Sequence, residues 1–135
     1  MNLAEEAVLE YLTHDGDVFV CPQYRAPGGN PDFVALDFIK HQVTVVEVST
    51  AYGLGNLRDK LKRKDWIDSV RQELKKKGVI DDGWRLIVRV FVAAAYKSQL
   101  ENDKAEDLEI ETIDHVFECL LDWQKKFTRE AQTLV

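Results

Sequence analysis

The sequence predicts one α/β domain with a mixed central sheet flanked by helices. Three observations carry this prediction. Three short runs rich in β-branched and aromatic residues lie between positions 18 and 48, a helical segment follows at 57–77, and a strongly apolar run follows at 85–95. A three-stranded meander joined to a further strand through a crossover helix fits this order. Neither a Pro- or Ser-rich linker nor an internal repeat divides residues 1–135, so we assign a single domain.

The composition excludes disordered, fibrous and membrane-spanning classes. The chain has 135 residues, of which 45% are hydrophobic and 31% charged, as in an ordinary globular domain. No stretch approaches the roughly 20 apolar residues of a membrane span, and the N-terminus is acidic where a signal peptide is basic. We interpret the two cysteines as reduced, and we expect a cytoplasmic protein without a membrane partner.

The first elements are predicted to be a helix and a strand. Residues 3–11 place apolar side chains on one helical face. Residues 18–24 form a short apolar run typical of a strand, and the Pro- and Gly-containing segment 26–31 predicts a loop. The next two runs, 33–39 and 43–48, are separated by so few residues that we expect a tight antiparallel hairpin.

The second half of the chain alternates helix and strand. Residues 57–77 are predicted to form one long helix, and 85–95 a strand that is covered on both sides. A polar and acidic connection at 96–107, a short strand at 108–113 and a closing helix at 115–134 complete the prediction.

Charge is distributed unevenly along the chain. Residues 58–77 contain nine Lys and Arg against four Asp and Glu, a net charge of +5, whereas the whole chain carries −6. A phosphate-bearing partner is therefore expected to bind at this segment. Alternatively, the basic segment is only a solvated helix face that binds no partner. A third interpretation is that the acidic remainder of the surface binds a basic partner.

Two acidic residues are predicted to share one face of the hairpin. If Ile39 pairs with Gln42, Asp32 lies opposite Ser49, and Glu47 is its diagonal neighbour. The same register sets Val34 opposite Glu47. The two carboxylates would then lie within reach of a shared cation.

The apolar neighbours of Glu47 predict that its carboxylate is half-buried, which is costly without a partner. Mg²⁺ is bound through carboxylates, water and phosphate oxygens, a ligand set that Asp32, Glu47 and a backbone carbonyl near Val48 can supply. The alternative is that Asp32 only closes the preceding turn and Glu47 pairs with an internal lysine.

These residues resemble the PD-(D/E)XK nuclease superfamily, whose members have the restriction-endonuclease-like fold. The resemblance is nearest to its Holliday-junction-resolvase-like members and covers residues 3 to about 93. The positions that carry it are Glu5, Tyr11-Leu12, Gly16, Tyr24-Arg25, Gly29-Asn30-Pro31-Asp32 and Val46-Glu47-Val48.

The resemblance implies an αβββαβ core, here with an extra C-terminal helix, and a Mg²⁺- or Mn²⁺-dependent DNA endonuclease that hydrolyses phosphodiester bonds by metal-activated water. It implies that Asp32 and Glu47 bind the metal, beside the Val48 carbonyl that the ligand chemistry of Mg²⁺ suggests. A further carboxylate would come from Glu5, with Glu6 as the less favoured choice.

One departure concerns the catalytic lysine of the family motif, whose position is occupied by Ser49. A hydroxyl supplies no positive charge. Some relatives take the lysine from a neighbouring element, and Lys60 is our candidate because it lies near the start of the basic segment. The alternative function is a catalytically inactive nuclease-fold module that binds DNA or another protein.

The expected partner is nucleic acid, DNA by the resemblance. The residues predicted to contact it are Arg58, Lys62, Arg63, Lys64 and Tyr52. A homodimer is a further expectation, with Trp123 and Phe127 of the closing helix at its seam, and packing of that helix on the sheet is the alternative.

Overall fold

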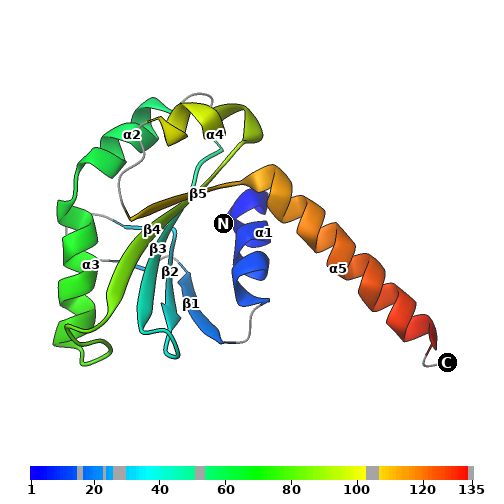
Figure 1. The fold of residues 1–135 in the computed structure, drawn as a ribbon, viewed down its shortest axis with the longest axis horizontal. Coiled ribbons are helices and arrows are strands. Elements are labelled where there is room, and N and C mark those ends of the chain that lie inside the picture. The colour runs from blue at the N-terminus through cyan, green and yellow to red at the C-terminus, as the bar shows by residue number, and fades with distance from the viewer. Residues whose placement is uncertain (15–16, 23, 26–29, 51–53, 103–106, 134–135) are drawn as a thin grey trace.

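The protein folds into a five-stranded sheet with helices on both faces. The computed structural model describes residues 1–14, 17–22, 24–25, 30–50, 54–102 and 107–133 (Figure 1). In chain order the elements are α1 (Leu3–Thr13), β1 (Val18–Pro22), β2 (Phe33–Asp37), β3 (Gln42–Val48), α2 (Gly55–Lys62), α3 (Asp65–Lys76), β4 (Arg85–Val92), α4 (Ala94–Glu101), β5 (Leu108–Thr112) and α5 (Ile113–Thr133). The predicted α/β class is confirmed. Among the described residues, the helices include none that combines the length and the apolar character needed to cross a membrane.

The sheet has the order β1-β2-β3-β4-β5. The first three strands form an antiparallel meander, whereas β4 is parallel to β3 and β5 is parallel to β4. Parallel neighbours require crossover connections, which α2 with α3 and then α4 provide. The predicted meander and crossover are therefore confirmed.

Two apolar cores lie on the two faces of the sheet. The helices α2 and α3 cover one face through residues such as Leu57, Trp66 and Val70. On the other face, Val8 of α1 and Val116 of α5 pack in a second core (Figure 1). The inner strand β4 is buried along most of its length, as its apolar run predicts.

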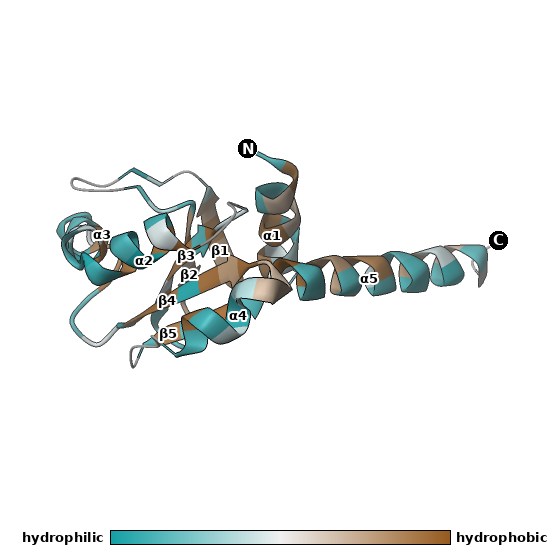
Figure 2. Cartoon of the chain, turned by 90° about the horizontal axis from the view of Figure 1, so that it is seen from above, coloured by the Kyte–Doolittle hydropathy of each residue, from teal (hydrophilic) through white to brown (hydrophobic). Residues whose placement is uncertain are grey.

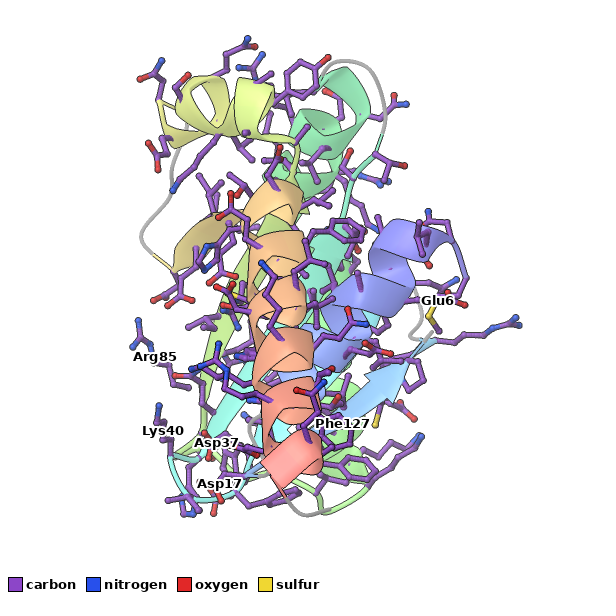
Figure 3. All side chains as sticks on the ribbon, turned by 90° about the vertical axis from the view of Figure 1, so that its right-hand side faces the viewer. Glu6, Asp17, Asp37, Lys40, Arg85 and Phe127 are labelled. Carbon is purple, nitrogen blue, oxygen red and sulfur yellow. The ribbon has the colours of Figure 1, made fainter. Side chains whose placement is uncertain are left out.

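The hairpin between β2 and β3 is shorter than predicted. Asp37, not Ile39, pairs with Gln42. The Asp37 carboxylate accepts hydrogen bonds from the backbone N–H groups of Ile39 and Lys40, at 3.0 and 2.9 Å, and these bonds fold the chain out of the ladder. His41 completes the turn with a positive φ of 54°. Figure 3 shows Asp37 and Lys40 at this end of the sheet.

The predicted long helix is two helices. Arg63 leaves helical geometry, with φ −84° and ψ 118°, so that α2 ends at Lys62 and α3 begins at Asp65. Leu61 and Ile67 are six positions apart, a spacing that one straight helix does not keep on one face. The break allows both helices to direct their apolar sides to the sheet.

Several other elements differ from prediction in their bounds. The strand predicted at 85–95 ends at Val92, because the next residues begin α4. The helix α4 occupies part of a segment predicted to be a polar connection, and its Leu100 is buried in the core. The short strand β5 is confirmed, and α5 begins two residues before the predicted start.

Gly78 follows α3 in a left-handed conformation with φ 73°. We expect Gly78→Ala to lower the free energy of unfolding by about 1 kcal/mol, because a side chain strains this conformation. Gly55→Ala is the matched control: no atom lies within 4 Å of an added Cβ at either glycine, and only Gly78 has a positive φ. Urea unfolding of both variants measures the difference, and equal effects would contradict the prediction.

Candidate active site

Asp32 precedes β2, and its side chain reaches the end of β3. Phe33 pairs with Val46, so that continuing the register by one position sets Asp32 opposite Glu47. The Asp32 Oδ2 atom accepts a hydrogen bond of 2.8 Å from the backbone N–H of Val48. Directly opposed residues share a sheet face, so the two carboxyl groups project on the side covered by α2 and α3.

The predicted cross-strand register is wrong by two residues. Val34 pairs with Val45 rather than with Glu47, and Asp32 does not oppose Ser49. A shift of two positions keeps every side chain on its predicted face. Asp32 and Glu47 therefore still share a face, but they are directly opposed instead of diagonal.

Glu47 is a buried carboxyl group, with only 7% of the residue exposed. The pKa of Glu47 is raised to about 7, mainly by this burial and in part by the negative charge of Asp32. Hydrogen bonds from the Lys60 side chain and the Asp32 backbone act in the opposite direction. Ionised Glu47 thus depends on nearby cations.

Lys60 supplies one such cation from α2. Its Nζ atom lies 2.7 Å from Oε1 of Glu47 and donates a second hydrogen bond of 3.1 Å to the backbone carbonyl of Asn30. The structure thus brings Asp32, Glu47 and Lys60 together from three separate segments. Lys60 lies toward the end of the short helix α2, whereas the sequence placed it near the start of a longer one.

Trp66 positions Lys60, and no motif in the sequence indicates this role. Its indole Nε1 donates a hydrogen bond of 2.8 Å to the Lys60 carbonyl, which satisfies a backbone group left open where α2 ends. The Lys60 Nζ atom lies 5.0 Å from the Trp66 ring centroid, in cation–π range. Trp66 is fully buried, and its proximity to Lys60 depends on the helix break.

Ser49 continues the sheet beyond β3. Its backbone N–H donates a hydrogen bond of 2.9 Å to the Phe91 carbonyl. The predicted metal ligand Val48 is the last residue of β3, and the contact it makes at the site is the N–H bond to Asp32.

Glu5 is not brought into this cluster. It lies in the first turn of α1, where Asn2 binds both its backbone N–H, at 2.8 Å, and its carboxylate, at 3.1 Å. The helix α1 packs on the face opposite Glu47, and Glu6 lies at its exposed edge (Figure 3). In the part of the chain that the structure describes, no group of three or more His, Cys, Asp or Glu could hold a metal ion.

The predicted phosphate-contacting residues divide into two groups. Lys62, Arg63 and Lys64 are exposed at the junction of α2 and α3. Arg58 is half-buried and donates a hydrogen bond of 3.3 Å to the Gln99 carbonyl, so it connects α2 to α4. Tyr52 lies outside the described residues, as do Gly16 and Gly29 of the family resemblance.

Asp32 and Glu47 fit the chemistry of a Mg²⁺ ligand pair. Mg²⁺ in proteins is commonly bound by one or two carboxylates and completes its shell with water and phosphate oxygens. A divalent cation beside Glu47 would offset the desolvation that raises the pKa of this carboxyl. Asp32 is only half-buried, so this carboxylate of the pair is accessible to solvent beside the end of β3.

Comparisons with protein-family models, curated proteins and solved structures found no match to this chain. The geometry around Glu47 is therefore the basis for a functional proposal.

We expect Glu47→Gln to raise the melting temperature more at pH 8 than at pH 5. The pKa of Glu47, about 7 in the folded protein, exceeds its ordinary value of 4.5. The folded state therefore retains a proton that the unfolded state has lost, and wild-type stability falls as the pH rises through this window. Glutamine does not ionise, so the variant escapes this loss.

Thermal melts followed by circular dichroism at both pH values measure this effect. Asp59→Asn, which removes an exposed carboxylate from α2, is the matched control and should show no such pH dependence. An equal increase in the melting temperature of Glu47→Gln at pH 5 and pH 8 would contradict the prediction.

Proposed function

We propose that this chain is a Mg²⁺-dependent DNA endonuclease with a restriction-endonuclease-like core. The observation that carries the proposal is a pair of opposed carboxylates, the buried one of which is bound by a lysine from another element. Lys60 Nζ contacts Glu47 at 2.7 Å, and Asp32 binds the next backbone N–H along β3 at 2.8 Å. Metal-dependent phosphodiester hydrolysis uses residues of these types.

The order of elements supports the same proposal. The segment from α1 to β4 runs helix, three antiparallel strands, crossover helices and a parallel strand, compatible with the αβββαβ core that the sequence resemblance implies. The carboxylates lie at the end of the meander, where β2 begins and β3 ends.

Each residue has a role in the proposed reaction. Asp32 and Glu47 would hold Mg²⁺ or Mn²⁺, which lowers the pKa of a bound water and so supplies the nucleophile. Lys60 contributes, from another element, the positive charge that Ser49 lacks. Glu47 must lose its proton to bind a cation, so metal affinity increases as the pH rises through about 7.

We expect Asp32→Asn and Lys60→Ala each to reduce DNA cleavage by at least about 100-fold. Supercoiled plasmid and branched DNA with Mg²⁺ or Mn²⁺ are the substrates. Lys76→Ala, an exposed lysine at the end of α3, is the matched control and should leave the rate unchanged. Calorimetric titration with Mn²⁺ should show weaker binding for Asp32→Asn. The absence of cleavage by the wild type with both metals would overturn the proposal.

A DNA-binding module without catalysis is the second candidate. The direct pairing of Glu47 with Lys60 favours it, because the ion pair satisfies the buried carboxylate without a metal. The exposed cations Lys62, Arg63 and Lys64 would then bind phosphates.

For such a module we expect DNA affinity to be independent of Mg²⁺ beyond its effect on ionic strength. Replacing Lys62, Arg63 and Lys64 with Ala should weaken binding and reduce the salt dependence of the affinity, because fewer counterions are released. Fluorescence anisotropy with labelled DNA at several salt concentrations measures both quantities. Unchanged affinity and salt dependence would exclude this surface as the DNA contact.

A further inference from the structure

The helix α5 extends well beyond the rest of the molecule. It runs from Ile113 to Thr133, or about 30 Å at 1.5 Å per residue. Figures 1 and 2 show its first turns against α1 and its C-terminal half projecting away from the sheet. The projecting half must therefore derive its stability from its own side chains or from another molecule.

One side of α5 is used within the chain. Val116 is buried against α1, and Trp123 stacks on Tyr11 and His14, with ring centroids 5.9 and 3.6 Å apart. Trp123, predicted from the sequence as part of a dimer seam, is thus an internal contact. It fixes the point at which α5 leaves the body of the protein.

Beside these internal contacts, α5 leaves large apolar residues exposed to solvent. Phe117 is 37% exposed, Leu121 55% and Phe127 72%. With Glu10 and His14 of α1, these residues line a groove of about 450 Å³. Figure 3 marks Phe127 near the outer end of the helix. Exposed apolar residues in this arrangement are typical of an interaction surface.

The charges beside this apolar side change sign along the helix. Glu118 and Asp122 lie before the middle of the exposed stretch, whereas Lys125 and Arg129 lie after it. Glu118 and Lys125 are seven residues apart, about two helical turns, so they lie on the same flank, with Leu121 between them.

This pattern is complementary to itself when two copies of α5 run antiparallel. A twofold axis beside Leu121 places Glu118 of each copy opposite Lys125 of the other. A parallel pair would instead place Glu118 next to Glu118 and Lys125 next to Lys125. Charge therefore selects the antiparallel arrangement, as flanking charges do in coiled coils.

We propose that two copies of this chain associate through antiparallel α5 helices, with Leu121 at the centre of the interface, Phe117 beside it and Phe127 at its edge. The interface is isologous, since one surface meets its own copy. The inference rests on α5 and on the groove that it forms with α1, and it is independent of the proposed nuclease activity.

Sedimentation velocity of the full chain over a range of concentrations tests the proposal. The wild type should form dimers, and Leu121→Glu should be monomeric with an unchanged circular dichroism spectrum. Glu118→Lys and Lys125→Glu should each weaken dimerisation by about tenfold, because each places like charges in contact twice. An equimolar mixture of these two variants should restore dimers, because both cross-copy pairs again have opposite charge.

Lys126→Glu is the matched control, since it makes the same charge change on the other side of the helix and should leave dimerisation unaffected. At about 100 µM even a weak dimer is populated, so a wild type that is monomeric at this concentration would overturn the proposal. An equimolar mixture of the two charge variants that forms no dimers would also overturn it. Binding of a monomeric wild type to phosphatidylcholine vesicles would assign the apolar side to lipid instead.

Discussion

The ion pair between Glu47 and Lys60 joins the sheet to the crossover helices. A buried carboxylate at the end of β3 is costly, as the upward pKa shift of Glu47 shows. Lys60 offsets this cost only because α2 ends where it does and the indole of Trp66 binds the lysine from the start of α3. The pair of Glu47 and Lys60 therefore depends on both the helix break and the buried Trp66.

Strong local patterns explain why much of the fold follows from the sequence. The β-rich runs before residue 48 allow a meander, and the apolar run that forms β4 fits only a strand covered on both faces. These two inferences need only periodicity and chain order. The prediction of Lys60 needs more, because it follows from the family resemblance, which calls for a lysine that Ser49 replaces, and from the basic segment that offers one nearby.

The remaining features depend on interactions between distant or competing groups. Asp37 shortens the hairpin because its carboxylate binds two backbone N–H groups that would otherwise be available to the strand ladder. Strand propensity does not account for this competition. The break at Arg63 follows from packing both helices on the sheet. Trp66 reaches Lys60 only after that break, so no spacing along the chain indicates their contact.

The two edge strands of the sheet are built so that strands of other molecules do not readily pair with them. Its edges, β1 and β5, are both short. The strand β1 ends at Pro22, which has no N–H to donate, and β5 carries Glu109 and Glu111. A strand added from another copy of β5 would bring these acidic side chains together. The edges therefore resist the strand-to-strand joining that leads to aggregation, while the sheet interior remains strongly apolar.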